Sequence, residues 1–134
     1  MPYLNFKTST KLSDEQKKDI VDILMENTTT VLGKKAEVTA ISIESIDNKD
    51  WFINSNSLEF LNEQTFYLNI KITDGTNTKN QKALYIKNVF EQLSKVFENI
   101  SEASYIVIDD VNADSWGFSG KTQEYRYIDS INLW

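Results

Sequence analysis

The sequence predicts an α+β fold of two layers, in which two β-α-β repeats form a four-stranded mixed sheet with both helices on one face. Three observations carry this prediction. The run YLNFK at Tyr3–Lys7 recurs 64 positions later as YLNIK at Tyr67–Lys71. Each copy is followed by a helix-capping signal with an apolar stripe at helical spacing, and then by a second strand-like run. A strand, a helix and a strand in this order form a parallel pair with a right-handed crossover.

The first repeat opens with a strand over Tyr3–Thr8. Ser13 and Gln16 then form a capping box, because each side chain can bond the other residue's backbone N–H. Gly33 is expected to stop the helix, since glycine tolerates a positive φ. A closing strand is predicted over Glu37–Ile46. The residues of the helical stripe are Ile20, Val21, Leu24, Thr28, Val31 and Leu32.

The second repeat follows the same plan. A capping box at Thr78–Gln81 lies 65 positions after the first, and Trp116 likewise follows Trp51. The helical stripe is expected to run to Ile100, and the closing strand covers Ala103–Val111. The stripe consists of Tyr85, Ile86, Val89, Phe90, Leu93, Val96, Phe97 and Ile100. Beyond the repeats, a further strand is predicted over Tyr125–Ile128, where Arg126 stands between two tyrosines.

Strand alternation assigns the two faces of the sheet. Leu4, Phe6, Leu68, Ile70 and Ile72 are expected to face the helices. The opposite face is mixed and contains Tyr3, Asn5, Lys7 and their copies Tyr67, Asn69 and Lys71. The run Tyr105–Ile108 is apolar on both sides, which is typical of a strand covered on both faces. We therefore expect this face to be buried against other subunits, and the alternative is a solvated face with a few aromatic side chains.

Length and composition exclude several classes of protein. The 134 residues fit one domain, with repeats over about 2–60 and 66–120 and a C-terminal tail over 121–134. The absence of cysteine and histidine excludes disulfides, Ser-His-Asp triads and most zinc sites, and no metal or cofactor is implied. The net charge of −6 argues against nucleic-acid binding. No apolar run spans a membrane, and the N-terminal run lacks secretory-signal features, so a cytoplasmic location is expected.

Pro2 is the only proline in the chain, and it opens the first strand. If Met1 is removed, the chain begins with a secondary amine held in a ring, a group that can act as a base or as a nucleophile. An α-amino group has an ordinary pKa of roughly 8, and burial among apolar side chains lowers it. The alternative is structural, because a proline at the start of a strand lacks only a hydrogen bond that the strand does not need there.

Taken together, Met1-Pro2 before a strand, the SDEQK helix start at Ser13–Lys17 and the duplicated β-α-β unit resemble the tautomerase superfamily of 4-oxalocrotonate tautomerase. The length and duplication are similar to its long-subunit branch, which includes macrophage migration inhibitory factor and cis-chloroacrylate dehalogenase. Residues 105–117 are similar to the last strand and following turn of the inhibitory-factor group. The resemblance extends from Met1 to about Gly120 and leaves the tail without a counterpart.

The resemblance implies a cofactor-independent tautomerase that interconverts the keto and enol forms of a small 2-oxo acid, with Pro2 as the catalytic group. It also implies a homotrimer with pockets between subunits. The position matching Pro2 in the second repeat is Phe66, which has no free amine, so each chain would carry one site. The alternative is a non-catalytic trimer that keeps the fold for binding or structure. Whether Pro2 acts as base or nucleophile stays open.

Four further residues are candidates for substrate binding. The resemblance places Lys34, Tyr105 and Trp116 at pocket positions, and Arg126 is the only arginine in the chain. Three of them have a structural alternative: Lys34 favours the helix C-terminus, Tyr105 packs on the strand, and Arg126 lies at the surface. Trp116 is expected to form an aromatic wall.

The sequence also departs from the family. Arginines that hold carboxylates in 4-oxalocrotonate tautomerase and the dehalogenases would fall at Leu12 and at Thr76 or Asn77. Since the dehalogenases' activating acid and paired arginines have no clear match either, dehalogenase and decarboxylase activities are not assigned.

Overall fold

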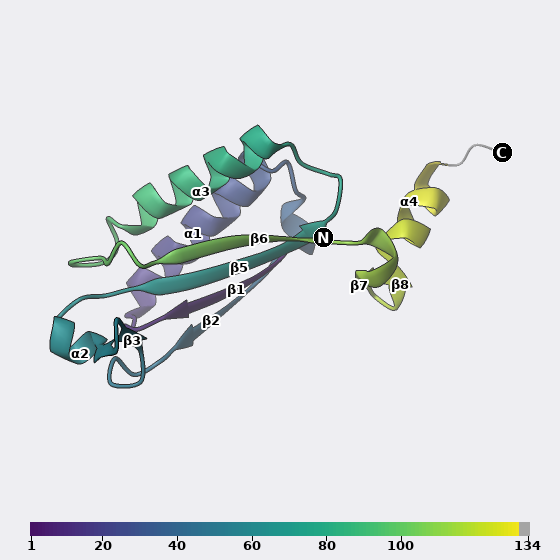
Figure 1. Ribbon diagram of the computed structural model, residues 1–134. Coiled ribbons are helices and arrows are strands. Elements are labelled where there is room, and N and C mark those ends of the chain that lie inside the picture. The colour runs from purple at the N-terminus through teal and green to yellow at the C-terminus, as the bar shows by residue number, and fades with distance from the viewer. Residues whose placement is uncertain (132–134) are drawn as a thin grey trace.

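The computed structural model describes residues 1–131 and has the predicted two-layer architecture (Figure 1). The first repeat consists of β1 (Tyr3–Thr8), α1 (Asp14–Thr30) and β2 (Ala40–Ser45), and the second of β5 (Phe66–Thr73), α3 (Lys79–Leu93) and β6 (Tyr105–Val111). Short elements connect them: η1 (Ala36–Val38), β3 (Phe52–Ile53), β4 (Asn56–Ser57) and α2 (Leu58–Leu61). The chain continues through η2 (Ala113–Ser115), β7 (Gly117–Phe118), β8 (Lys121–Thr122) and α4 (Gln123–Ile131).

The main sheet has the strand order β2-β1-β5-β6. Within each repeat the two strands are parallel, and the repeats join through antiparallel pairing of β1 with β5. Asn5 lies opposite its own copy Asn69 at the centre of that pairing. The two repeats are therefore related by an approximate two-fold axis, which confirms the predicted mixed sheet.

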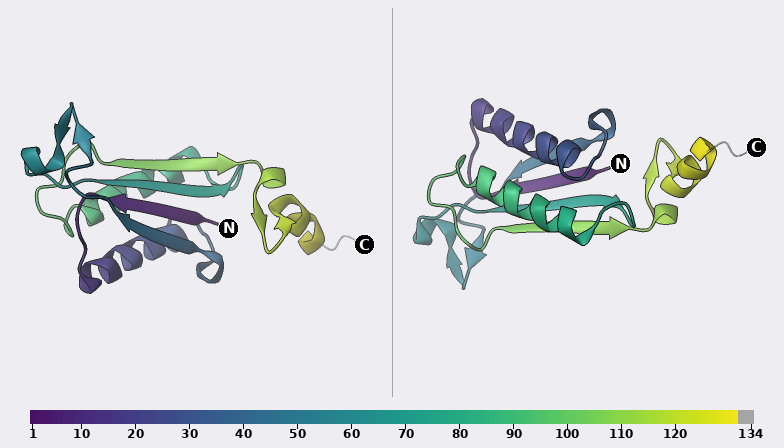
Figure 2. Two further views of the ribbon diagram at one scale, coloured as in Figure 1. Left: turned by 90° about the horizontal axis from the view of Figure 1, so that it is seen from below. Right: turned by 90° about the horizontal axis from the view of Figure 1, so that it is seen from above.

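Helices α1 and α3 lie side by side on one face of the sheet (Figures 1 and 2). Both predicted capping boxes are present: Gln16 N–H donates to Ser13 Oγ and Gln81 N–H donates to Thr78 Oγ1, each at 3.1 Å. The approximate axis also passes between the helices, where the buried Asn27 donates to Gln92 Oε1 at 2.9 Å.

The helices end earlier than their apolar stripes predict. Helix α1 ends at Thr30, although Gly33 has the expected positive φ of 68°. Helix α3 ends at Leu93, and the Ser94 hydroxyl that follows bonds back to the Phe90 carbonyl. The last residues of the second stripe still pack on the core, but from a turn.

The closing strands are shorter than predicted. Residues 36–38 form the 3-10 turn η1, so β2 begins at Ala40 and not at Glu37. Similarly, β6 begins at Tyr105, because Ala103 N–H bonds the Ser101 hydroxyl in the preceding turn. In both cases a local turn occupies residues whose composition suits a strand.

The core lies between the sheet and the two helices. Its fully buried members include every residue predicted for the inner face: Leu4, Phe6, Leu68, Ile70 and Ile72. From α3, Tyr85 reaches across to bond Thr28 Oγ1 at 3.0 Å. Burial raises the pKa of Tyr85 to about 12, so its hydroxyl stays neutral in this dry layer.

No element covers the outer face of the sheet within the described chain (Figure 2). Tyr105 is 61% exposed, Tyr3 41% and Val107 40%. Exposed apolar side chains on neighbouring strands form the type of surface that a partner covers. Among residues 1–131, no helix is long and apolar enough to cross a membrane.

The strand predicted over Tyr125–Ile128 is wrong, because these residues belong to helix α4. The alternating pattern there resembles a strand, but Thr122 Oγ1 accepts the N–H of Tyr125 at 3.0 Å and starts a helix. The β7–β8 hairpin and α4 project beyond the end of the sheet at which the N-terminus lies (Figure 1). The last three residues of the predicted tail, 132–134, lie outside the described residues.

Candidate active site

Strand directions bring distant parts of the chain to one end of the sheet. Because β1 is antiparallel to β5, and β6 is parallel to β5, the start of β1 lies beside the ends of β5 and β6. Pro2 is buried there, and its carbonyl accepts the N–H of Ala40 at 3.2 Å. The chain leaving β6 at Val111 turns through η2 and places Trp116 against the N-terminus.

A cavity of about 300 Å³ opens beside Pro2. Its walls come from the N-terminus, the approach to β2 and the turn after β6: Met1, Pro2, Tyr3, Glu37, Val38, Thr39, Ala40, Trp116, Gly117 and Phe118. The indole Nε1–H of Trp116 donates to the Met1 carbonyl oxygen at 2.6 Å. Trp116 is thus directly beside the predicted catalytic residue.

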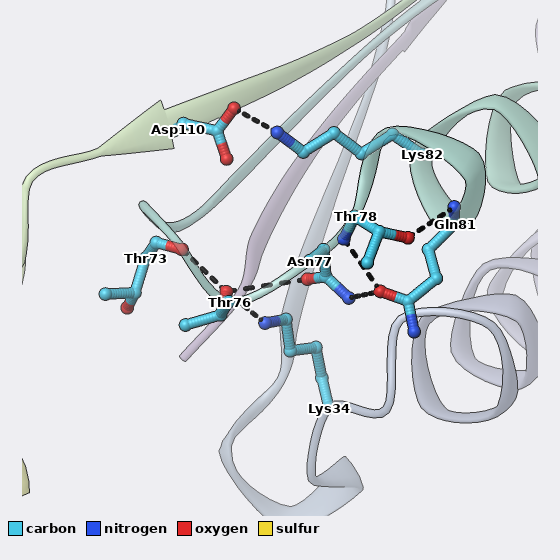
Figure 3. Close-up of polar contacts among 8 residues, drawn as sticks. All are labelled: Lys34, Thr73, Thr76, Asn77, Thr78, Gln81, Lys82 and Asp110. Carbon is cyan, nitrogen blue, oxygen red and sulfur yellow. Dashed lines mark hydrogen bonds and ion pairs between the residues drawn. The ribbon is translucent and has the colours of Figure 1, made fainter.

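Lys34 belongs to the same end of the sheet. It follows Gly33 after α1, and its Nζ donates to Thr76 Oγ1 at 2.7 Å (Figure 3). Thr76 stands in the turn after β5, at a position where the family resemblance would place an arginine. Burial lowers the pKa of Lys34, and the nearby Asp110 opposes that effect.

The turn after β5, which contains Thr76 and Asn77, is hydrogen-bonded to both repeats. Asn77 Nδ2 donates to the Leu32 carbonyl at 2.9 Å and to Gln81 Oε1 at 3.1 Å. Lys82 and Asp110 form an ion pair of 2.5 Å next to it (Figure 3). These bonds fix the end of α1 against the start of α3 and so position the Lys34 side chain.

Arg126 reaches the site from α4. Its guanidinium lies over the Phe118 ring, 4.6 Å from the ring centroid, in a cation–π contact. Phe118 is also part of the cavity wall. The helix that replaces the predicted strand therefore still delivers Arg126 to the neighbourhood of the N-terminus.

The electrostatics of this end act on the terminal amine. Burial lowers the pKa of the Met1 amine from its ordinary value of 8.0, and the positive charges of Lys34 and Arg126 lower it further. Pro2, the next residue, is buried in the same environment.

Tyr105 lies elsewhere within the chain. It pairs with Tyr67 at the opposite end of β6 from the turn that carries Trp116. Tyr105 and Val111 are six steps apart along the strand, which corresponds to about 20 Å. The structure thus gathers four of the five predicted site residues at one end and leaves Tyr105 at the other.

Two residues of the site were not singled out by sequence. Phe118 lines the cavity and contacts Arg126, and Thr76 accepts from Lys34. The run Trp116-Gly117-Phe118 gave one signal for Phe118, because alternate residues of an extended segment point to the same side. Thr76 was named only as a position where the family carries an arginine, and its contact with Lys34 had no local signal because the two residues lie 42 positions apart.

A larger cavity, of about 690 Å³, opens at the opposite end of the sheet. Its walls include Lys11, Asp47, Glu59, Glu63 and Glu98, and none of the predicted site residues. The smaller cavity is the candidate site because Met1, Pro2 and Trp116 line it. Within residues 1–131, no group of three acidic side chains lies close enough together to hold a metal ion.

The fold and the site define a duplicated β-α-β protein whose second residue, Pro2, lines a pocket. A family model described as "Tautomerase enzyme" matches residues 67–125. The matched stretch begins in β5 and ends in α4, so it covers the second repeat and the segment that follows it. No curated protein sequence matches the chain closely enough to count as a relative.

Solved structures show the same fold along nearly the whole chain. A fused 4-OT wild-type asymmetric trimer is 21% identical, with 93% of this chain and 98% of that chain covered and a TM-score of 0.82. A native fused 4-OT is 17% identical, with 92% and 97% covered and a TM-score of 0.80. A malonate semialdehyde decarboxylase inhibited by 3-bromopropiolate is 15% identical, with 95% and 96% covered and a TM-score of 0.72.

Proposed function

We propose that this protein is a cofactor-independent tautomerase that interconverts the keto and enol forms of a small 2-oxo acid, with Pro2 as the general base after removal of Met1. One observation supports the proposal above all: the chain's start is buried beside Trp116, with two cations near enough to lower the pKa of the terminal amine. The tautomerase fold supports the same class of reaction.

The chemistry needs a neutral amine. In ketonisation, the Pro2 nitrogen takes the proton of the enol hydroxyl, and the carbonyl double bond forms as the carbon–carbon double bond opens. The pair of electrons released from that bond then takes the proton from Pro2 onto carbon. Enolisation is the reverse. A base with a pKa near the working pH is the most efficient catalyst for both directions.

Lys34 and Arg126 replace the family's missing arginines as anion-binding groups. Leu12, at one expected arginine position, is buried in the core, and Thr76, at another, accepts a hydrogen bond from Lys34. A lysine binds a carboxylate as a point charge, whereas an arginine can form two parallel hydrogen bonds. We therefore assign the substrate carboxylate to Lys34 and Arg126, which lie near the N-terminus just outside the cavity wall.

We further propose that the protein is a homotrimer in which the outer face of the sheet is buried. The exposed aromatic side chains of Tyr3 and Tyr105 support this, as do structural neighbours described as trimers. Tyr105 lies too far from Pro2 of its own chain, so it would contribute to a pocket of a neighbouring subunit. Sedimentation equilibrium is expected to give three times the chain mass at micromolar concentration, and a stable monomer would contradict the proposal.

The pH dependence of ketonisation tests the role of the terminal amine. With phenylenolpyruvate as substrate, kcat/KM is expected to rise with pH as the amine loses its proton, with a midpoint below the value of roughly 8 that an ordinary α-amino group has. Lys34→Met removes a cation that disfavours the protonated amine, so the midpoint moves upward and KM rises. Lys35→Met, one residue away and exposed, is the matched control and leaves the midpoint in place. A wild-type midpoint at or above 8.0 would contradict the assignment.

The second candidate function is a non-catalytic binding or structural role. The replacement of a family arginine by the buried Leu12 favours it, because the pocket then holds carboxylates less selectively. This role predicts ligand binding in the cavity without any turnover of phenylenolpyruvate.

A further inference from the structure

We infer that the indole N–H of Trp116 is a catalytic hydrogen-bond donor to the substrate oxygen on which negative charge develops. The inference rests on the proposed tautomerase function and extends it, because the sequence predicted only an aromatic wall at this position. The carbonyl or enol oxygen of the substrate would accept a hydrogen bond from Trp116, and the substrate carboxylate would bind Lys34 and Arg126.

The Met1 carbonyl group shows where such an oxygen would lie. Its carbon is bonded to the Pro2 nitrogen, and its oxygen accepts from Trp116 Nε1 at 2.6 Å. These atoms stand in for the carbon and oxygen of a ligand carbonyl held against that nitrogen. Removal of Met1 takes this acceptor away and opens the same position to substrate.

The backbone of Trp116 is held in place without help from Met1. The Trp116 carbonyl accepts the N–H of Gln123 at 2.7 Å, and Ser115 N–H bonds the Asn112 carbonyl at 2.8 Å. The turn before Trp116 and the hairpin after it therefore fix its backbone. Within residues 1–131, the Met1 oxygen is the one hydrogen-bond acceptor that the indole N–H contacts. In the processed chain this donor faces the cavity and needs a new acceptor, which is water or substrate.

The chemical character of the donor suits the oxygen and not the carboxylate. An indole N–H is neutral and donates only, so it stabilises a developing oxyanion without taking part in proton exchange. A fixed donor of this kind acts where charge appears in the transition state, which is the most effective form of electrostatic catalysis. The donor serves Pro2 as base and Pro2 as nucleophile alike, because charge develops on the same oxygen in both roles.

The test compares variants of the chain that begins at Pro2, with phenylenolpyruvate at pH 7. Replacement of Trp116 by benzothienylalanine exchanges the N–H for sulfur and keeps the ring shape. We expect kcat to fall roughly 100-fold while KM changes less than about threefold. Trp116→Phe is expected to show the same loss. Trp116→His restores a ring N–H, so its kcat is expected to be roughly tenfold higher than that of Trp116→Phe.

Trp51→Phe is the matched control, because Trp51 is the counterpart of Trp116 in the first repeat. It is expected to leave kcat within about twofold of wild type. A benzothienylalanine variant as fast as wild type would overturn the role of Trp116 while the Pro2 function stands. Equal losses in the phenylalanine and histidine variants, with unchanged melting, would overturn it as well. A rate that does not depend on Pro2 at all removes both the function and the inference.

Discussion

Pro2→Ala is expected to lower kcat/KM for phenylenolpyruvate ketonisation by roughly 100-fold or more, because general base catalysis contributes about 10²–10⁴-fold. The alanine amine is still an amine, but it is no longer held in a ring at the start of β1, so its lone pair is not fixed toward the cavity. Circular dichroism and melting are expected to match wild type. A variant that keeps the full rate would contradict the assignment of Pro2.

An acylated Pro2 provides the sharper form of this experiment. A removable N-terminal tag leaves the Pro2 nitrogen in an amide, which is not basic, so the tagged chain is expected to show no rate above background. Proteolytic cleavage directly before Pro2 is expected to restore activity in the same sample. Intact mass of both forms, and of untagged protein from cells, reports whether Met1 is present. Equal rates before and after cleavage would exclude a free terminal amine as the catalyst.

The largest effect on stability is expected at Phe66, the residue that matches Pro2 in the second repeat. Its side chain is fully buried, with its ring centroid 5.6 Å from that of Phe6 and 6.1 Å from that of Phe97. Phe66→Ala removes a whole aromatic side chain from this stack and leaves a cavity. We expect the free energy of unfolding to fall by about 3–5 kcal/mol, measured by urea denaturation at constant protein concentration.

Phe60→Ala is the matched control, because Phe60 is the same residue type but 77% exposed. Its free energy of unfolding is expected to change by less than about 0.5 kcal/mol. Similar losses in the two variants would show that burial in the described core is not what stabilises Phe66. The pair of Phe66 and Pro2 also shows how duplication diverges: the same repeat position supports the core in one half and opens onto a cavity in the other.

The architecture was accessible from the sequence because each repeat carries local signals. Capping boxes at Ser13 and Thr78 mark the helix starts, and strand alternation assigns the inner face of the sheet. These signals act over a few residues, so they can be recognised without knowledge of the fold. They were less reliable at element ends, because α3 ends at Leu93 although its apolar stripe continues through the following turn.

The error at Tyr125–Ile128 has a different origin. Alternation of large and charged residues suits a strand, but a strand needs a partner with free backbone groups. The β7–β8 hairpin is too short to offer one, and Thr122 caps a helix that satisfies its own backbone. Whether residues 125–128 form a strand or a helix depends on whether another strand is available to pair with them. The local sequence pattern does not contain that information.

By itself, the sequence determined the duplicated β-α-β plan, the tautomerase resemblance and Pro2 as the candidate catalytic residue, because repeats, caps and a unique residue are local features. Only the tertiary structure decided which side chains meet Pro2. Trp116 reaches Met1 across 115 positions and Lys34 reaches Thr76 across 42, whereas Tyr105 is carried to the far end of its strand. Strand direction and register set these distances, and both are properties of the assembled sheet.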